Sequence, residues 1–486
     1  MSSQIRSVVN YVGGRPVETG TTFEVFDPVT GAVAAHVHEA TADTVDAAVR
    51  AAREALRGPW GKLTTDERID MVLGIADGVG KRFDEFVDAE VSDTGQAFNM
   101  AKRVNIPRGA ANFRTFAHTL REHATEAFRM DTPDGLGALN FAIRRPRGVI
   151  GVISPWNAPM LLMTWKVGPA LAFGNTVVVK PSEETPSTAA LLAEVMNDVG
   201  VPAGAYNVVH GAGAVGEMLT THPDVDGITF TGETVTGSRI LEAVAPTLKA
   251  TSMEMGGKNP GIVFADADLD NATRVLGRSI FLNAGQVCLG TERVYIHESI
   301  FDELAGRLVE HAKSLTPGFP HEDGVTLGPV VSQQQQRKIL DYYQVAVDEG
   351  ANVLVGGGVP SFGDERDGGY WVEPTLWTGL GHDSRTAREE IFGPCAALIP
   401  FSDEDEVVEM ANDTNYGLSA TIFTRDLSRA LRVTQQLEAG VIWVNEWFLR
   451  DLRTAFGGAK HSGLGREGGV HGLEFYTEIS NICIKI

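Results

Sequence analysis

The chain has few cysteines for its length. Its 486 residues include only Cys288, Cys395 and Cys483. No two of them show CxxC or another metal-ligand spacing, so we expect neither a disulfide framework nor a zinc site, and no metal. So few cysteines fit the reducing cytoplasm.

Basic residues are also scarce, with 41 Lys and Arg against 63 Asp and Glu, a net charge of −22. This negative field repels phosphate backbones and anionic membranes, so we expect no nucleic-acid partner. An anionic small molecule would be repelled as well, and its site would need local arginines.

Long apolar runs are missing too. No uncharged apolar stretch approaches the ~20 residues of a membrane span, and residues 1–10 lack the apolar core of a signal peptide. We expect a soluble, cytoplasmic protein that does not insert into membranes.

What the chain does have is a pattern typical of an α/β fold, over a length that suits two or three domains. From Gly148 onward, short β-branched runs alternate with helical patterns and predict a parallel sheet. These runs are 149–153, 176–179, 207–209, 228–230 and 262–264. Upstream, apolar residues at helical spacing begin at Val45, and helical character is expected to continue to near Arg129.

A second α/β pattern begins near Asp268 and predicts a separate domain that carries Cys288. Its strand-like runs are 294–296, 353–355, 396–400, 419–423 and 441–445. Residues 136–145 and 482–486 fit neither pattern. They alternate apolar and polar residues, which predicts strands with unpaired edges.

Cys288 and Glu254 are a candidate nucleophile and a candidate base. A lone cysteine is more often a small buried apolar residue, and a lone glutamate more often caps a helix or forms a salt bridge. Together they suit a reaction in which a thiolate adds to a carbonyl and a carboxylate later activates water.

With Trp156-Asn157 and several glycine-bordered turns, these segments resemble the aldehyde dehydrogenase superfamily across essentially the whole chain. The resemblance implies a Rossmann-like NAD-binding domain (1–123 and 147–255), an α/β catalytic domain (256–470) and a β oligomerisation arm (124–146 and 471–486). It implies a homodimer or homotetramer, and the alternative is a tail folded on its own domain.

The resemblance also assigns chemical roles. Cys288 is the nucleophile, the side-chain amide of Asn157 stabilises the oxyanion with the Cys288 N–H, and Glu254 activates the water that hydrolyses a thioester. Lys166 and Glu467 support a water relay behind the base.

The motif Gly211-Ala-Gly213-Ala-Val-Gly216 matches GxGxxG literally, but it follows a late strand and lacks an acid at a strand end, so we do not assign it to the phosphates. In the family it lies beside the adenine. The run from Phe230 to Gly237 is the stronger phosphate candidate, because a strand leads there through glycine into a helix N-terminus. Glu233 replaces the usual serine, and we expect its side chain to point away or to bond a helix-start N–H.

The resemblance places Lys180 and Glu183 on the adenosine ribose and Glu390 on the nicotinamide ribose. A carboxylate at Glu183 would repel a 2′-phosphate, which favours NAD over NADP. The full set of expected cofactor-binding residues is Ile153, Ser154, Pro155, Trp156, Lys180, Ser182, Glu183, Gly213, Phe230, Thr231, Gly232, Glu233, Gly256, Glu390 and Phe392.

The segments 447–458 and 465–478 look like the branch of the family that oxidises 2-hydroxymuconic and 2-aminomuconic semialdehydes in aromatic meta-cleavage. Those substrates carry a carboxylate, which a guanidinium binds in a bidentate way. The resemblance assigns Arg108 and Arg450, together with Asn157, to substrate binding. The alternative is an exposed Arg450 or Arg453 that pairs with Asp451, and for Arg453 both this pairing and substrate contact stay open.

Four alternatives stay open. The departures Glu446, Ala455 and Ala459 leave room for another substituted semialdehyde, and a general aldehyde dehydrogenase is a broader reading. Acylating relatives, which use coenzyme A, typically lack the base that Glu254 provides. An NAD-binding structural protein without activity is a different class, which the fold alone does not exclude.

Overall fold

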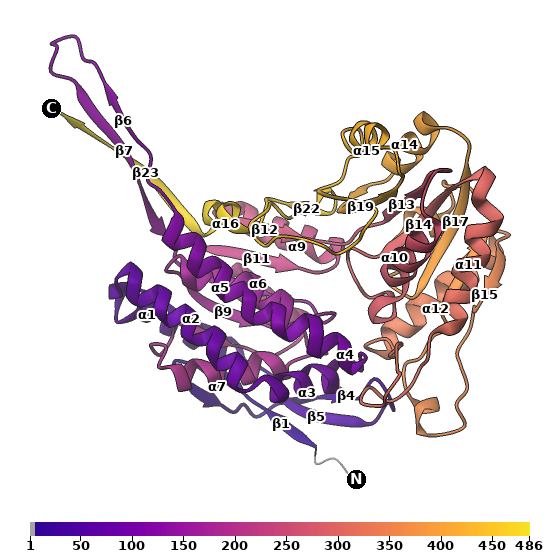
Figure 1. The fold of residues 1–486 in the computed structure, drawn as a ribbon. Coiled ribbons are helices and arrows are strands. Elements are labelled where there is room, and N and C mark those ends of the chain that lie inside the picture. The colour runs from indigo at the N-terminus through magenta and orange to yellow at the C-terminus, as the bar shows by residue number, and fades with distance from the viewer. Residues whose placement is uncertain (1–4) are drawn as a thin grey trace.

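The computed structural model describes residues 5–486. Two α/β bodies stand side by side, and a narrow arm projects from one of them and ends close to the C-terminus (Figure 1). Among the described residues, no helix is both long and apolar enough to cross a membrane.

The first body is built on an eight-stranded sheet in the order β22-β12-β11-β8-β9-β10-β2-β3. Its five central strands, β8 to β12, run parallel, as the sequence pattern predicts, and antiparallel strands close both edges. The strands are β2 (Asn10–Val12), β3 (Arg15–Val17), β8 (Val149–Ile153), β9 (Thr176–Lys180), β10 (Tyr206–Val208), β11 (Gly227–Thr231), β12 (Ala250–Glu254) and β22 (Gly463–Leu464).

Helices cover both faces of this sheet because successive side chains of a strand point to opposite faces. On β8, Ile150 and Val152 belong to one apolar cluster, and Val149 and Ile153 belong to another. The first cluster contains α2 (Thr65–Lys81), α3 (Phe83–Thr94), α5 (Ile106–Glu122), α6 (Pro159–Ala172) and α7 (Ser187–Val199); the second contains α1 (Ala42–Arg57), α8 (Gly213–Thr221) and α9 (Thr234–Val244).

The second body has a seven-stranded sheet in the order β15-β16-β17-β14-β13-β19-β20, parallel except for β15. Its strands are β13 (Asn259–Val263), β14 (Thr291–His297), β15 (Asn352–Val355), β16 (Thr375–Thr378), β17 (Cys395–Phe401), β19 (Ser419–Phe423) and β20 (Val441–Val444). The helices α10 (Leu269–Phe281) and α11 (Phe301–Ser314) pack on one face, and α12 (Gln333–Asp348), α14 (Glu404–Asn412) and α15 (Leu427–Thr434) on the other.

The run 262–264 was predicted in the first sheet, and this is wrong. Its strand β13 lies between β14 and β19 in the second sheet. Buried parallel strands look alike in sequence, so the pattern could not show that the chain crosses to the other body after Glu254.

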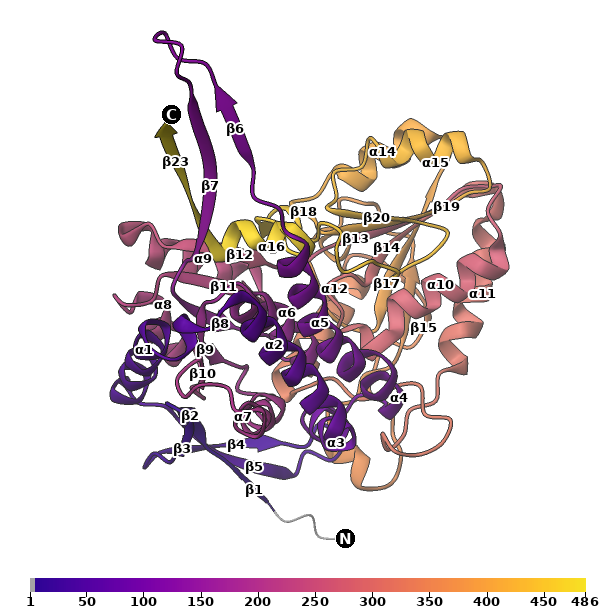
Figure 2. The ribbon, with the colours of Figure 1, turned by 60° about the vertical axis from the view of Figure 1, so that its left-hand side comes forward.

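The arm is an antiparallel sheet in the order β23-β7-β6, with α16 (Gly469–Tyr476) at its base (Figure 2). Its strands are β6 (Ala127–Met130), β7 (Ala138–Pro146) and β23 (Thr477–Lys485). The helical pattern predicted to reach Arg129 stops earlier, since α5 ends at Glu122 and residues 127–130 pair with β7. The two unassigned pieces therefore pair with each other, and within residues 5–486 the outer edge of β23 has no partner strand.

The remaining elements are short. They include β1 (Arg6–Val8), β4 (Thr22–Phe26) and β5 (Val33–His38) in a small N-terminal sheet, the pair β18 (Tyr416–Gly417) and β21 (Ala459–Lys460), the helices α4 (Phe98–Met100) and α13 (Arg385–Arg388), and a π-helical turn at Ala101–Asn105. Short 3₁₀-helical turns lie at Trp60–Lys62, Ala245–Thr247, Leu282–Gly285, Glu298–Ile300 and Glu365–Gly368.

Candidate active site

A cleft of ≈ 1110 Å³ brings both bodies together at the candidate chemistry. Asn157 and Cys288 line it, and so does every cofactor-binding residue expected from the sequence, from Ile153 to Phe392. The sequence did not point to Gln335 and Lys338 on α12, which also line the cleft. They carry no motif, and only the fold brings that helix here.

Cys288 follows a tight left-handed turn. Asn283, Ala284 and Gly285 have φ values of 54°, 53° and 73°. A Cβ on Gly285 would overlap the carbonyl of Gly393, so this position requires glycine. The turn presents the Cys288 thiol, which is partly exposed, to the cleft.

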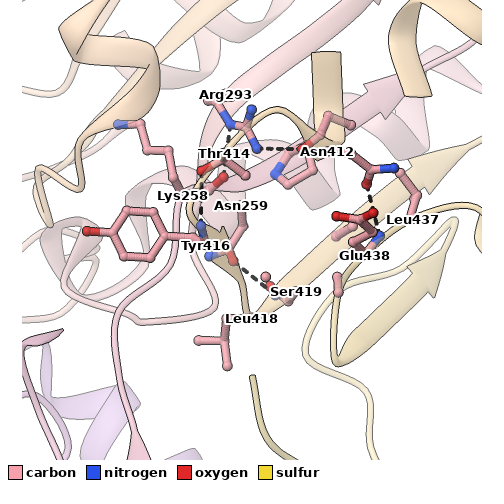
Figure 3. A pocket seen from close by; sticks show the side chains of 15 residues that line it. Lys258, Asn259, Arg293, Asn412, Thr414, Tyr416, Leu418, Ser419, Leu437 and Glu438 are labelled. Atoms are coloured by element: carbon pink, nitrogen blue, oxygen red, sulfur yellow. Dashed lines mark hydrogen bonds between the residues drawn. The ribbon is translucent and has the colours of Figure 1, made fainter. Parts of the chain in front are cut away.

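Asn259 holds the far side of this turn. Its Nδ2 donates to the carbonyl oxygens of Cys288 and Gly290, both at 2.8 Å, and its Oδ1 accepts from the Ser419 N–H at 3.0 Å. Figure 3 shows this residue beside Arg293, whose Nε donates to the Lys258 carbonyl at 2.9 Å. The pocket in that view has only ≈ 10 Å³, so it is a packing gap behind the catalytic turn.

Asn157 is directed at the same turn. Its Nδ2 donates to the Gln286 carbonyl at 3.0 Å, and its own carbonyl accepts from Asn283 Nδ2 at 2.9 Å. The side-chain amide predicted to stabilise an oxyanion is thus held by the carbonyl of Gln286, two residues before the nucleophile in sequence, and it lines the same cleft as Cys288.

The thiol is protonated at neutral pH in this arrangement. Burial, together with the carboxylates of Glu254 and Glu390, raises the pKa of Cys288 to about 12. Nucleophilic attack therefore needs a group that takes the thiol proton.

Glu254 ends β12 and is buried, and its Oε1 has no hydrogen-bond partner within residues 5–486. A Cβ on Gly457 would come 2.8 Å from this oxygen, so glycine leaves the space beside it. Burial and the nearby Glu467 raise the pKa of Glu254 well above its ordinary value, against the opposing charges of Lys166 and two arginines. Such a carboxyl group suits general-base catalysis near neutral pH.

Behind Glu254 lies a buried ion pair. Lys166 Nζ donates to Glu467 Oε1 at 2.9 Å, and Ser252 Oγ donates to the same oxygen at 3.0 Å. The two residues that the resemblance places behind the base are therefore in contact and act electrostatically on it.

On the other side of the cleft, Lys180 is buried and donates to the carbonyls of Pro181 (2.8 Å) and Gly211 (2.6 Å), with Glu183 Oε2 at 3.4 Å. Burial lowers the pKa of Lys180. Glu233 precedes α9 but makes no capping bond to it; its Oε1 lies 3.8 Å from Lys338 Nζ. Of the two orientations expected for Glu233, the structure has the one that points away from the helix start.

Glu390 accepts from the Gly257 N–H at 2.8 Å, and burial and the charge of Glu292 raise its pKa to about 7. The ring of Phe392 meets the Trp156 ring edge to face, with 5.4 Å between centroids. The turn that carries Glu390 thus packs on the segment just after the base.

Arg450 lies between two aromatic rings. Its guanidinium carbon is 4.0 Å from the Phe456 centroid and 4.6 Å from that of Trp165, and its buried Nε has no hydrogen-bond partner in the described chain. Burial and the charge of Arg108 lower its pKa to about 10, and the charges of Glu254, Glu467 and Cys288 act in the opposite direction. Arg450 therefore remains a cation at neutral pH, and it interacts electrostatically with Arg108 and with the Cys288 thiol.

Arg108 and Arg453 differ in their surroundings. Burial lowers the pKa of Arg108, and Asp451 opposes this. Arg453 is 75% exposed and holds Asp451 with two bonds, Nε to Oδ1 at 3.0 Å and Nη2 to Oδ2 at 2.7 Å. Of the two expectations for Arg453, the structure has the surface pair.

This geometry defines an enzyme site: a cysteine and an amide line a cleft between two α/β bodies, and a buried carboxylate outside the lining acts on the cysteine through its charge. The family model described as "Aldehyde dehydrogenase family" matches residues 16–482, and the chain belongs to this family. The family, the α/β fold and the enzyme class predicted from the sequence are confirmed.

Two curated relatives and one solved structure show how close the likeness is. The chain is 59% identical to the 2-hydroxymuconic semialdehyde dehydrogenase of Pseudomonas sp. (strain CF600), over 99% of this chain and 100% of that protein. It is 53% identical to a 2-aminomuconic 6-semialdehyde dehydrogenase of Pseudomonas sp., over 98% of each. The NAD+ complex of an aldehyde dehydrogenase from Bacillus cereus superposes with a TM-score of 0.95 at 35% identity, covering 99% of this chain and 97% of that one.

Proposed function

We propose that the protein oxidises a semialdehyde that carries a carboxylate, of the 2-hydroxymuconic type, to the dicarboxylate with NAD, in aromatic meta-cleavage catabolism. The observation that carries the proposal is the guanidinium of Arg450, whose charge acts on the candidate thiol and base and whose buried Nε has no hydrogen-bond partner within residues 5–486. Aldehyde oxidation alone does not need a cation there, whereas a substrate with a distal carboxylate does.

The cleft fits NAD. The first turn of α9 has no side-chain cap, so its N–H groups are free for a pyrophosphate. Glu183 and the half-buried Glu390 supply carboxylates at two points of the same cleft, which suits the hydroxyls of two riboses. NAD, when bound, supplies the acceptor for the hydride. The NAD+ complex of the Bacillus cereus relative supports this cofactor.

In the proposed reaction, Glu254 takes the thiol proton and Cys288 Sγ adds to the aldehyde carbon. The Asn157 amide and the Cys288 N–H then stabilise the oxyanion. With NAD held in the cleft as the hydride acceptor, hydride would leave that carbon, the carbonyl would re-form and a thioester would remain on Cys288.

A water molecule then attacks the thioester. Glu254, which has by then passed the thiol proton through Lys166 and Glu467 to solvent, removes a proton from the water. The C–S bond breaks, Glu254 returns this proton to the Cys288 thiolate, and the acid product leaves. Lys166 and Glu467 contact each other rather than the reacting atoms. We therefore assign them two roles: they adjust the pKa of Glu254, and they relay its proton away from the site.

Arg450 binds the distal carboxylate of the substrate in this proposal, with Arg108 as a second cation. The rings of Trp165 and Phe456 hold the guanidinium plane and exclude water from it, which strengthens a charge-assisted pair. Arg453 takes no part in substrate binding in this proposal, because its guanidinium already pairs with Asp451.

The experiment is to follow NADH formation with NAD and 2-hydroxymuconic semialdehyde, with benzaldehyde in a parallel assay and with Cys288→Ala as the blank. Preference for the semialdehyde supports the proposal. Equal or faster turnover of benzaldehyde would remove the substrate assignment and leave a general aldehyde dehydrogenase. NAD binding without turnover of any aldehyde would favour the structural-protein alternative.

A 2-aminomuconic semialdehyde is the second candidate, because the relative that is named for that substrate is 53% identical. The hydroxy compound is favoured by the 59% identity of the first relative. Both carry the carboxylate, so Arg450 does not separate them. Competition between the two substrates in one assay shows which of them the enzyme prefers.

We further propose a homodimer or homotetramer that assembles through the arm, in the cytoplasm. The strands of the arm expose large apolar side chains: Phe128, Met130, Leu139, Ile479 and Ile484. Such side chains next to an unpaired strand edge favour pairing with a second copy. The domain boundaries expected from the sequence (1–123 with 147–255, 256–470, and 124–146 with 471–486) are retained in this proposal.

A further inference from the structure

One buried carboxylate near the cofactor cleft has no role in the chemistry above. Glu292 lies on β14, four residues after Cys288, and is 6% exposed. Its side chain meets the Lys258 ammonium, which is 1% exposed. Burying an ion pair has a large desolvation cost, so its retention here calls for a purpose beyond stability.

The same carboxylate also binds two backbone N–H groups of the turn that carries Glu390. Glu292 Oε2 accepts from the Ile391 N–H at 3.0 Å, and Oε1 accepts from the Phe392 N–H at 2.8 Å. Charge-assisted bonds of this kind are about twice as strong as neutral ones. One side chain thus fixes two successive peptide groups that are a hundred residues further along the chain.

The turn needs such a restraint. Phe392 has φ 63°, in the left-handed region that bulky residues avoid. A conformation of this kind persists only where the surroundings over-determine it. The Phe392 ring, held in this way, meets the Trp156 ring at the cleft.

A second carboxylate completes the connection. Glu390 accepts from the Gly257 N–H, next to the Lys258 that pairs with Glu292. The segment after Glu254 and the turn of Glu390 are therefore joined twice, once by each acid. Glu292 is the acid of the two that faces no ligand, because it does not line the cleft.

We propose that Glu292 is a positioning residue, which acts through its bonds to Ile391, Phe392 and Lys258 to fix Glu390 and Phe392 where they receive the nicotinamide half of NAD. This inference rests on the proposed function, in which NAD is the cofactor. It assigns no contact between Glu292 and the ligand.

The test compares binding of NAD and of ADP to the purified protein by calorimetry. ADP contains the adenosine and pyrophosphate but not the nicotinamide half, so it engages the Lys180 and Glu183 side of the cleft alone. Three variants are needed: Glu292→Gln, the conservative Glu292→Asp, and the matched control Glu389→Gln, which changes a neighbouring glutamate that pairs with Arg385 at the surface.

In Glu292→Gln the amide must point an NH₂ group at an N–H donor or at the Lys258 ammonium, so the restraint is lost. We expect the NAD Kd to rise about tenfold or more, since each tenfold equals about 1.4 kcal/mol and one or two charge-assisted bonds are removed. The ADP Kd should stay within about twofold. Glu292→Asp should lie between the wild type and Glu292→Gln, and Glu389→Gln should match the wild type.

Two results would overturn the inference. The first is an NAD Kd in Glu292→Gln that stays within about twofold of the wild-type value. If Glu292→Gln does not fold, the NAD Kd of Glu292→Asp is compared with the wild type instead. An equal loss of NAD and ADP affinity is the other, because it indicates general damage to the cleft. Absence of NAD binding by the wild type would instead contradict the proposed function itself.

Discussion

The guanidinium of Arg450 lies 4.0 Å from the centre of the Phe456 ring, and Phe456 is bridged by backbone hydrogen bonds to Glu467, the acid behind the base. The cation and the base support are therefore held by one short piece of chain. This link couples the proposed anchor for the substrate carboxylate to the residue that supports the base.

The thiol of the cofactor-free protein should react slowly near neutral pH. Burial and two carboxylates raise the pKa of Cys288 to about 12, so the thiolate fraction grows with pH through the whole alkaline range. Alkylation by iodoacetamide should rise steadily with pH and show no plateau near 8.5. The assay uses Cys483→Ser, because Cys483 is exposed. A plateau below pH 9 would contradict the prediction.

Glu254→Gln should separate acylation from hydrolysis. The variant lacks the base that activates water, so the thioester accumulates while hydride transfer still occurs once per site where the pH supplies thiolate. Stopped-flow absorbance at alkaline pH should show a burst of NADH equal to the enzyme concentration, followed by a steady rate about 10²–10⁴-fold below that of the wild type. Steady turnover near the wild-type rate would remove Glu254 as the base.

The charges behind Glu254 should move its titration in opposite directions. Glu467 helps to raise the pKa of Glu254 and Lys166 helps to lower it. A base works deprotonated, so the acidic limb of thioester hydrolysis should shift to lower pH in Glu467→Gln and to higher pH in Lys166→Met. Each variant leaves a buried polar partner behind, so thermal unfolding is recorded as the control. Shifts in the same direction would contradict the electrostatic explanation.

Glu183→Ser should relax cofactor choice. The glutamate lies beside Lys180 and would repel a 2′-phosphate, while serine would not. The ratio of kcat/KM for NADP to that for NAD should rise by about tenfold or more, equal to about 1.4 kcal/mol. Glu217→Ser, another acid that lines the cleft, tests whether any loss of negative charge suffices. An unchanged NADP ratio in Glu183→Ser would contradict the assignment.

Removal of residues 477–486 should break the assembly. The deletion takes away β23, which pairs with β7 along its whole length and provides the outer edge of the arm. Sedimentation velocity should show a smaller species than that of the full chain, while Lys485→Ala, a change of one exposed side chain, should keep the original mass. An unchanged mass after the deletion would place the interface elsewhere.

The strands and residues that could be predicted from the sequence are those that carry local signals. The β-branched runs of β8 and β9 are of this kind, and so are the short motifs that contain Cys288 and Glu254. The sheet to which β13 belongs depends on pairing with β14 and β19, and no local pattern encodes that pairing. The tertiary structure around a strand, not its own sequence, determines which sheet it joins.

The role of Glu292 shows the same limit at the site. In sequence it is one acid near the start of a strand, and its meaning comes from bonds to residues about a hundred positions away. Glu254 and Cys288 were found because each lies within a motif. The surroundings of Arg450 required the structure, since Trp165 and Phe456 come from distant parts of the chain.

The most direct measurement compares Arg450→Met with Arg453→Met, a matched control three residues away whose guanidinium is on the surface. The ratio of kcat/KM for 2-hydroxymuconic semialdehyde to that for benzaldehyde is the quantity. It should fall about 10- to 100-fold in Arg450→Met, because a charge-assisted bond contributes about 1.5–3 kcal/mol, and stay at the wild-type value in Arg453→Met. An equal loss of activity on both aldehydes in Arg450→Met, or an unchanged ratio, would contradict carboxylate recognition by Arg450.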